Sequence, residues 1–194
     1  MRRPDDIAAA NELGVDYVGF VFAEKSKRRV SAEQAAALKA LLDPAVKAVG
    51  VFVNAAPETV AGLLEKDIID LAQLHGTEDA AYIERIRELT GKPLIRAFRI
   101  RERADLAGAE SFPADHVLLD AGAGDGRPFD WDLLTGFSRP YFLAGGLTPE
   151  NVGPAVERLR PFAVDVSSGI ETAGFKDLEK MTAFVNAVRE KEIL

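Results

Sequence analysis

The 194-residue sequence contains no cysteine. Disulfides, thiolate metal sites and catalysis by a cysteine of this sequence are therefore excluded. Histidine is nearly as scarce, because only His75 and His116 are present and they stand far apart. With so few nitrogen and sulfur ligands we expect no metal site. The sequence also lacks a P-loop and a Gly-x-Gly-x-x-Gly motif behind a strand, so no nucleotide cofactor is indicated.

Positive charge is also in short supply. Lys and Arg number 24 and Asp and Glu number 31, which gives a formal net charge of −7. This acidic balance argues against nucleic acid and against an anionic membrane surface as partners. No apolar run approaches the roughly 18 residues of a membrane span, and no signal peptide opens the sequence. With 47% hydrophobic residues and this length, we expect a single cytoplasmic domain over residues 1–194.

Short apolar segments alternate with segments of helical periodicity along the whole sequence. The apolar segments are rich in Val, Phe, Leu and Ile, which is typical of parallel strands buried on both faces. They are Tyr17–Phe22, Val46–Val53, Ile68–Leu74, Pro93–Phe98, His116–Leu119, Pro140–Ala144 and Phe162–Val166. Helices are predicted over Asp5–Leu13, Ala32–Leu42, Pro57–Glu65, Glu78–Thr90, Arg101–Ala109, Asp130–Gly136, Pro149–Leu159 and Asp177–Glu190. Ser31 and Thr148 suit the N-cap positions of two of them.

The repeated order of strand, helix and strand predicts parallel βα units. Seven predicted strands are each followed by a helix, and one further helix, Asp5–Leu13, precedes the first strand. A closed (β/α)8 barrel needs one more strand, which would lie immediately before Met1. We therefore predict an α/β fold of the (β/α)8 TIM-barrel type that is missing its first strand. A doubly wound open sheet is the alternative, but it explains neither the leading helix nor the even repeat.

The active site of such barrels lies in the loops at the C-terminal ends of the strands. Gly145 and Gly146 end one predicted strand, and Ser167, Ser168 and Gly169 end the next. Backbone amides freed by glycine, hydroxyl donors and a helix N-terminus favour an anion, and the last two loops of such barrels commonly bind phosphate. Tight turns alone would explain one pair of glycines, but they explain two such neighbouring loops less well.

Three further polar residues follow predicted strands. Asp120 could act as a general acid or base at the barrel mouth, or simply cap a helix or turn. The planar guanidinium of Arg28 could pair bidentately with a substrate carboxylate, whereas its basic neighbours are interpreted as solvated surface. His75 could move a proton, although a hydrogen-bonded structural histidine at a strand end is favoured. The glycine-rich segment 122–126 is interpreted as a flexible loop over a pocket.

Several motifs spread over nearly the whole sequence belong together. They are Gly19-Phe20-Val21-Phe22 with Ser26-Lys27-Arg28, Val49-Gly50-Val51-Phe52-Val53-Asn54, Gln73-Leu74-His75-Gly76, Leu118-Leu119-Asp120, Phe129-Asp130-Trp131, Ala144-Gly145-Gly146-Leu147-Thr148-Pro149-Glu150-Asn151-Val152 and Val164-Asp165-Val166-Ser167-Ser168-Gly169. In sequence and in order they resemble the phosphoribosylanthranilate isomerase family.

The resemblance implies a reaction and a role for each site residue. The reaction is the cofactor-free Amadori rearrangement of N-(5-phosphoribosyl)anthranilate to 1-(2-carboxyphenylamino)-1-deoxyribulose 5-phosphate in tryptophan biosynthesis. By the resemblance, Asp120 is the general acid that protonates the ribose ring oxygen, and Arg28 holds the anthranilate carboxylate. His75 counts among the substrate-binding residues, and the two final loops hold the phosphate of this small phosphosugar.

The sequence departs from the family at its start. The family begins with a strand of the type Lys-x-Cys-Gly, whose cysteine takes the proton from the sugar carbon next to the anomeric carbon. This sequence starts Met1-Arg2-Arg3-Pro4-Asp5-Asp6, just after the point where Cys-Gly would fall. The missing strand and the missing cysteine are thus one absence. Either Met1 is an internal methionine taken as the start or the gene is truncated, and the upstream DNA distinguishes the two.

Three functions remain after the resemblance. The first is an isomerase that is impaired because its general base is absent. The second is a non-catalytic, phosphate-binding barrel remnant, and the third and least favoured is another sugar-phosphate enzyme such as an epimerase. The absent strand would also leave two barrel edges exposed. Because an exposed edge recruits another strand, a homo-oligomer is expected.

Overall fold

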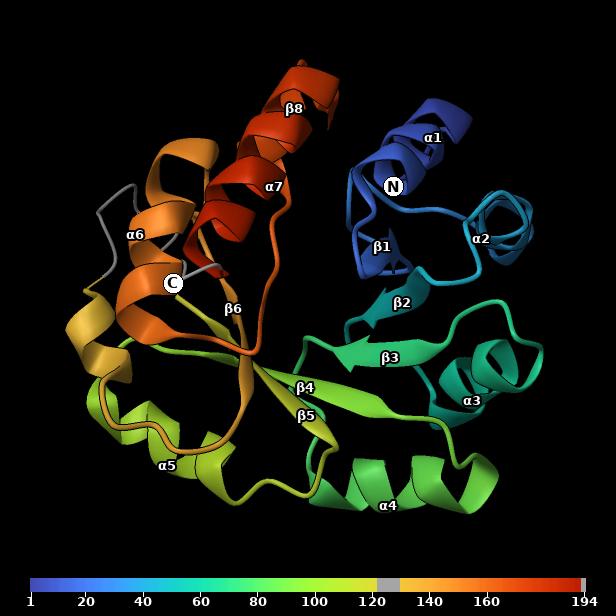
Figure 1. The fold of residues 1–194 in the computed structure, drawn as a ribbon. Coiled ribbons are helices and arrows are strands. Elements are labelled where there is room, and N and C mark those ends of the chain that lie inside the picture. Colours follow the sequence, from blue (N-terminus) through green and yellow to red (C-terminus); the bar gives the residue numbers. More distant parts are fainter. Residues whose placement is uncertain (122–129, 193–194) are drawn as a thin grey trace. The chain divides into compact units, whose positions relative to one another are not determined.

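The structure is a computed structural model that describes residues 1–121 and 130–192. These residues form two compact units, Met1–Arg96 with Pro113–Asp115, and Ala97–Phe112 with His116–Leu194. Both units consist of parallel strands with helices beside them (Figure 1). The seven parallel strands follow one another in chain order, β1 to β7. Strand β4 contributes its first half to the first unit and its second half to the second.

The first unit alternates helices and strands from its N-terminus. Its elements are α1 (Pro4–Leu13), β1 (Tyr17–Val21), α2 (Ala32–Lys39), β2 (Lys47–Phe52), α3 (Pro57–Glu65), β3 (Leu71–Leu74), α4 (Ala80–Leu89) and the start of β4 (Leu94–Arg99). The strands pair in parallel, with Gly19 opposite Val49 and Val49 opposite Leu71. Their C-terminal ends therefore lie at one edge of the sheet, where Asn54 and His75 follow β2 and β3.

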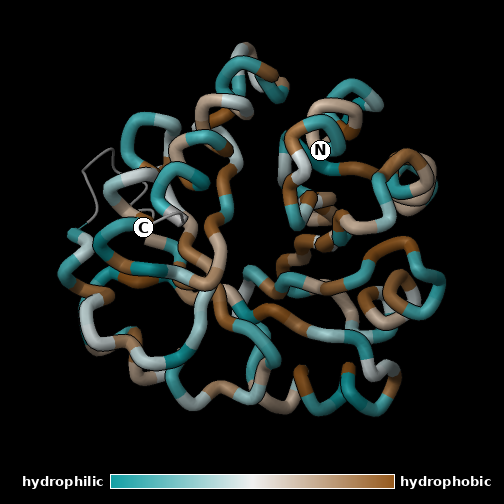
Figure 2. Tube along the Cα trace, viewed as in Figure 1, coloured by the Kyte–Doolittle hydropathy of each residue, from teal (hydrophilic) through white to brown (hydrophobic). Residues whose placement is uncertain are grey.

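Local sequence explains these elements. Ser31 accepts a hydrogen bond from the Gln34 amide at the start of α2, which confirms the predicted N-cap. Helix α4 begins where the Asp79 side chain accepts from the Tyr82 amide at 2.9 Å. Its turns alternate between hydrophilic and hydrophobic residues (Figure 2), because Ile83 and Ile86 pack into the core.

The second unit continues the alternation with shorter elements. They are the end of β4, η1 (Arg103–Asp105), α5 (Leu106–Glu110), β5 (His116–Asp120), η2 (Trp131–Leu134), β6 (Tyr141–Ala144), α6 (Pro149–Leu159), β7 (Ala163–Val164), η3 (Ser168–Ile170), β8 (Glu171–Thr172), β9 (Phe175–Lys176) and α7 (Leu178–Glu192). Strands β5, β6 and β7 pair in parallel, with Leu118 opposite Phe142 and Phe142 opposite Ala163. Helix α7 packs against α6.

The seven parallel strands and the leading helix lie where the sequence predicts them, but three details differ. The helix predicted over Asp130–Gly136 is a single 3₁₀ turn, η2. The Asp130 side chain caps its start by accepting from the Asp132 amide, and Gly136 follows its end with φ +87°. The last parallel strand contains only Ala163–Val164, and the antiparallel hairpin of β8 and β9 was not predicted. The predicted loop 122–126 lies outside the described residues. None of the helices in the described part is both long and apolar enough to cross a membrane.

Candidate active site

Asp120 is the last residue of β5, in the second unit. It lies opposite Ala144, the last residue of β6, and the Ala121 amide donates to the Ala144 carbonyl at 2.8 Å. The Asp120 backbone carbonyl accepts from the Ile100 amide at 3.0 Å, and its side chain is half-buried. The structure therefore brings the Asp120 carboxyl to the strand end next to the two glycines that follow β6.

Residues 145–148, here called the Gly145 loop, turn the chain from β6 into α6. Gly145 and Gly146 adopt φ values of +96° and +66°, in the left-handed region that favours glycine. Asn151 holds the loop from the first turn of α6, because its Oδ1 accepts from the Thr148 amide at 2.8 Å and its Nδ2 donates to the Gly146 carbonyl at 3.0 Å. Thr148 is the N-cap of α6, as predicted, and Pro149 follows it. The loop thus leads directly into the positive end of a helix dipole.

Residues 167–169, here called the Ser167 loop, follow β7. The loop packs directly on the Gly145 loop, since a Cβ atom built on Gly169 would stand 1.9 Å from the Leu147 carbonyl oxygen. Only glycine permits this approach of two backbones. Ser167 and Ser168 are exposed beside it. The structure therefore brings together the two loops that the sequence analysis assigns to phosphate.

Lys176 and Glu171 of the β8–β9 hairpin belong to the same site, and sequence reasoning missed them. The Lys176 Nζ donates to the Ser167 carbonyl at 2.7 Å and lies 3.3 Å from the Glu171 Oε1. Both side chains are nearly buried, with exposed fractions of 11% and 8%. Lys176 therefore holds the Ser167 carbonyl and places a positive charge beside the loop. The sequence signal that could have indicated this contact was a single lysine, Lys176, shortly after Ser167-Ser168-Gly169.

Arg28 lies in the first unit, in the loop after β1. The loop is held at both ends, because the Arg28 amide donates to Ser26 Oγ at 3.1 Å and the Val30 amide donates to the Val21 carbonyl at 2.9 Å. The Arg28 side chain is half-buried, whereas Lys27 and Arg29 on either side are exposed. This difference agrees with the interpretation of its neighbours as solvated surface.

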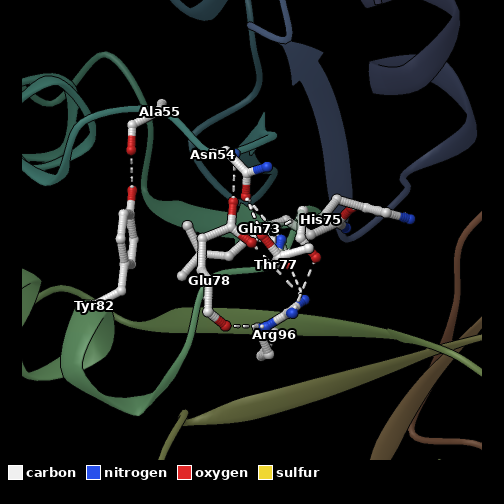
Figure 3. A network of polar contacts seen from close by, with 10 residues as sticks. Asn54, Ala55, Gln73, His75, Thr77, Glu78, Tyr82 and Arg96 are labelled. Atoms are coloured by element: carbon white, nitrogen blue, oxygen red, sulfur yellow. Dashed lines mark hydrogen bonds and ion pairs between the residues drawn. The ribbon is translucent and has the colours of Figure 1, made fainter.

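His75 directly follows β3 and is half-buried. Its backbone amide donates to the Phe52 carbonyl at 2.8 Å, and its Nδ1 lies 3.0 Å from the Oε1 of Gln73, which is buried. The loop behind it is bonded to Asn54 after β2, because Asn54 Oδ1 accepts from the Thr77 amide at 2.8 Å. Figure 3 shows Asn54, Gln73, His75 and Thr77 together at the ends of β2 and β3, beside Arg96 of β4. His116, by contrast, starts β5 and stacks on Phe162.

Burial changes two pKa values in this network. Arg96 of β4 is 8% exposed, and its burial lowers the pKa of the guanidinium while the nearby Glu78 carboxylate opposes that change. Burial raises the pKa of Tyr82 to about 12, and the carboxylates of Glu78 and Glu58 add to the shift. The Tyr82 hydroxyl therefore remains a donor, to the Ala55 carbonyl at 2.8 Å. A charged residue inside the apolar segment Pro93–Phe98 was the sequence signal for this network.

Seven parallel strands that follow one another in chain order, each with a helix between it and the next, place this chain in the class of (β/α)-barrel proteins of the TIM type, because a doubly wound sheet would reverse its strand order. The family "N-(5′-phosphoribosyl)anthranilate (PRA) isomerase" matches residues 1–187. The chain is also 42% identical, over 194 residues, to the N-(5′-phosphoribosyl)anthranilate isomerase of Endomicrobium trichonymphae, with 97% of this chain and 95% of that protein covered. The chain therefore belongs to the phosphoribosylanthranilate isomerase family.

Solved structures of this family have the same fold. The phosphoribosylanthranilate isomerase of Thermotoga maritima superposes with a TM-score of 0.91 at 36% identity, over 98% of this chain and 96% of that chain. A second structure shows monomers generated from that dimeric enzyme, with a TM-score of 0.87 at 36% identity, over 98% and 95% of the two chains. A family structure in complex with reduced 1-(o-carboxyphenylamino)-1-deoxyribulose 5-phosphate has a TM-score of 0.88 at 36% identity, over 98% and 95% of the two chains. These matches confirm the predicted TIM-barrel type.

Proposed function

We propose that this chain is an N-(5′-phosphoribosyl)anthranilate isomerase of tryptophan biosynthesis. The Amadori rearrangement gains and loses no atoms. The bond between the anomeric carbon and the ring oxygen breaks, the second sugar carbon loses its carbon-bound and hydroxyl hydrogens and becomes a ketone, and the first carbon and the ring oxygen gain one hydrogen each. It needs a proton donor for the ring oxygen and an acceptor for the carbon-bound proton. The carrying observation is Asp120 at the strand end beside the Gly145 loop. The complex of a family member with a reduced ketose phosphate of this kind supports the same chemistry.

Each site residue then has a role in the proposal. Asp120 donates the proton to the ring oxygen, and Arg28 holds the anthranilate carboxylate by its planar fork. The Gly145 loop and the Ser167 loop hold the phosphate through backbone amides and the hydroxyls of Ser167 and Ser168. His75 contributes to substrate binding, and neither a metal nor a cofactor takes part.

The proton acceptor of the family is a cysteine by the resemblance given above, and this sequence contains no cysteine. A general acid and a general base each contribute roughly 10²–10⁴-fold to a rate. We therefore propose that the 194-residue chain turns over slowly. A strand of the type Lys-x-Cys-Gly added before Met1 should raise kcat by at least about 100-fold.

The test compares three chains: the 194 residues alone, the same chain with the Lys-x-Cys-Gly extension, and one with Lys-x-Ser-Gly as the matched control. The control restores the strand without the thiol, so it separates stabilisation from catalysis. The proposal requires that only the cysteine form gains activity and that Asp120→Asn abolishes the gain. Full activity of the unextended chain would show another base. Phosphate binding without activity in all three chains would favour the alternative, a non-catalytic phosphate-binding barrel.

The proposal includes a partner and a location. We infer that the chain associates with a second copy of itself, as a dimeric family member from Thermotoga maritima does, and that it works in the cytoplasm. The small phosphosugar is the ligand, and the acidic net charge of −7 gives nucleic acid no basis for binding.

A further inference from the structure

A buried ion pair lies directly behind His75. The Arg96 Nη1 stands 3.9 Å from the Glu78 Oε2, and the two residues are 8% and 5% exposed. Taking two charges out of water is costly, and an apolar pair of similar size is often as stable. Five polar or charged residues are buried in the described part of the chain, and three of them surround this loop. The three are Gln73, Glu78 and Arg96.

The ion pair fixes the backbone on both sides of His75. Arg96 donates to the carbonyls of Leu74 at 3.1 Å and Gly76 at 3.0 Å, and its Nε donates to the Glu78 carbonyl at 2.8 Å. One guanidinium thus binds the residue before His75 and the residue after it. Its five donors in a planar fork suit this arrangement, which a lysine ammonium does not reproduce.

The Glu78 carboxylate completes the frame from the other side. Its two oxygens accept from the Asn54 amide at 2.7 Å and the Gly76 amide at 2.8 Å. Space is equally restricted, because a Cβ atom on Gly76 would lie 2.3 Å from Asn54 Oδ1. These contacts restrict the backbone of the loop between β3 and α4, and Figure 3 shows Asn54, Glu78 and Arg96 gathered around it.

Gln73 fixes the imidazole ring itself. Its Oε1 lies 3.0 Å from the His75 Nδ1. An amide oxygen only accepts hydrogen bonds, so this contact favours the neutral ring with the proton on Nδ1 and the lone pair on Nε2. Because Gln73 is itself buried at 5% exposure, the access of competing water to its side of this contact is limited.

We propose that Gln73, Glu78 and Arg96 are positioning residues that hold His75 in the Nδ1–H tautomer, with Nε2 as the hydrogen-bond acceptor for a hydroxyl of the phosphosugar. The inference rests on the proposed function, because it assigns His75 to that substrate. Glu78 and Arg96 act through the backbone of residues 74–76, and Gln73 acts through the ring.

The first test is structural and needs no activity. Nitrogen-15 NMR of labelled histidine reports the tautomer directly, and with only two histidines the His75 signals are assigned by a His116→Gln variant. We expect Nδ1–H in the full chain and loss of that preference in Gln73→Met, whose side chain has no amide oxygen to accept from Nδ1. An unchanged tautomer in Gln73→Met overturns the proposal.

The second test measures catalysis and product binding. Gln73→Met and Arg96→Lys should each lower kcat by roughly 10- to 100-fold, the cost of a misplaced group, and should weaken binding of 1-(2-carboxyphenylamino)-1-deoxyribulose 5-phosphate about 10-fold. Binding of inorganic phosphate, which the proposal assigns to loops of the second unit, should stay unchanged. Thr90→Val is the matched control, because it also removes a buried hydrogen bond of the first unit, that to Glu65, and should change only the melting temperature.

The outcomes separate this inference from the proposed function. A wild-type chain that binds the product but has no isomerase activity, with or without the extension, refutes the function. In that case a tautomer and a product affinity that both depend on Gln73 still support the positioning role. A Gln73→Met chain that loses the tautomer and keeps full kcat and product affinity refutes the positioning role and leaves the function standing.

Discussion

Replacing Gly169 by alanine tests the contact between the two phosphate loops most directly. The new Cβ would stand 1.9 Å from the Leu147 carbonyl oxygen and 3.2 Å from the Thr148 Cα, whereas ordinary contact begins at 3.4 Å. The distance to the oxygen is thus 1.5 Å shorter than ordinary contact. The oxygen belongs to the backbone of Leu147, and the Cβ is attached directly to the backbone of residue 169. No side-chain rotation relieves it, so one of the two loops must move.

The displacement sets the expected magnitude. An N–H···O hydrogen bond of about 2.9 Å that opens by more than an ångström is lost. Losing one such bond to a charged group costs about 1.5–3 kcal/mol, which weakens phosphate binding roughly 10- to 100-fold. Overpacking of the loop contact should also lower the free energy of unfolding by about 1–3 kcal/mol.

Calorimetric titration with inorganic phosphate, together with urea unfolding, measures both effects. Two glycine variants serve as controls. Gly174→Ala, between β8 and β9 and outside both phosphate loops, meets no atom within 4 Å but has φ +79°, so it should cost only the backbone strain of about 1–2 kcal/mol. Gly108→Ala in α5 makes an ordinary 3.8 Å contact with Phe98 and should stabilise the chain by roughly 0.5–1 kcal/mol. Wild-type phosphate affinity in Gly169→Ala would refute the reasoning.

Three further predictions concern other parts of the chain. In calorimetry, Arg28→Ala should weaken product binding by about 1.5–3 kcal/mol and leave the affinity for inorganic phosphate unchanged. Arg29→Ala, the control, should leave both affinities unchanged. Equal losses of affinity for both ligands in Arg28→Ala would contradict the assigned role. Burial alone would raise the pKa of Asp6, but hydrogen bonds from the Arg2 and Arg3 amides and the Arg3 side chain outweigh it and lower that pKa below 3.8. Asp6 therefore stabilises the fold above its unfolded pKa and loses that effect as pH falls through the folded value, so Asp6→Asn should cost about 1–3 kcal/mol in urea unfolding at pH 7 and less at pH 3. Strands β1 and β7 end the strand order, so we expect self-association, and a monomer in light scattering with a concentration-independent melt would disprove it.

Hydrophobic patterning alone determined the element order. Short Val-, Phe- and Leu-rich segments become buried parallel strands, and the caps Ser31, Thr148 and Asp130 start helical turns in the predicted places. These features depend on residues adjacent in the sequence, so single-sequence reasoning reaches them. The Gly145 and Ser167 loops could be predicted in the same way. Paired glycines indicate a backbone with positive φ, and neighbouring serines indicate exposed hydroxyl donors.

Only the tertiary structure decided which side chains support the site. Arg96 stands in an apolar strand, and Glu78 was predicted merely as the start of a helix, yet they meet behind His75. Lys176 reaches the Ser167 carbonyl from a hairpin that no periodicity indicated. Such contacts join residues 9 to 24 positions apart. They depend on which strand ends lie together and on how each buried charge finds its partners, and neither is encoded in the local pattern of any one segment.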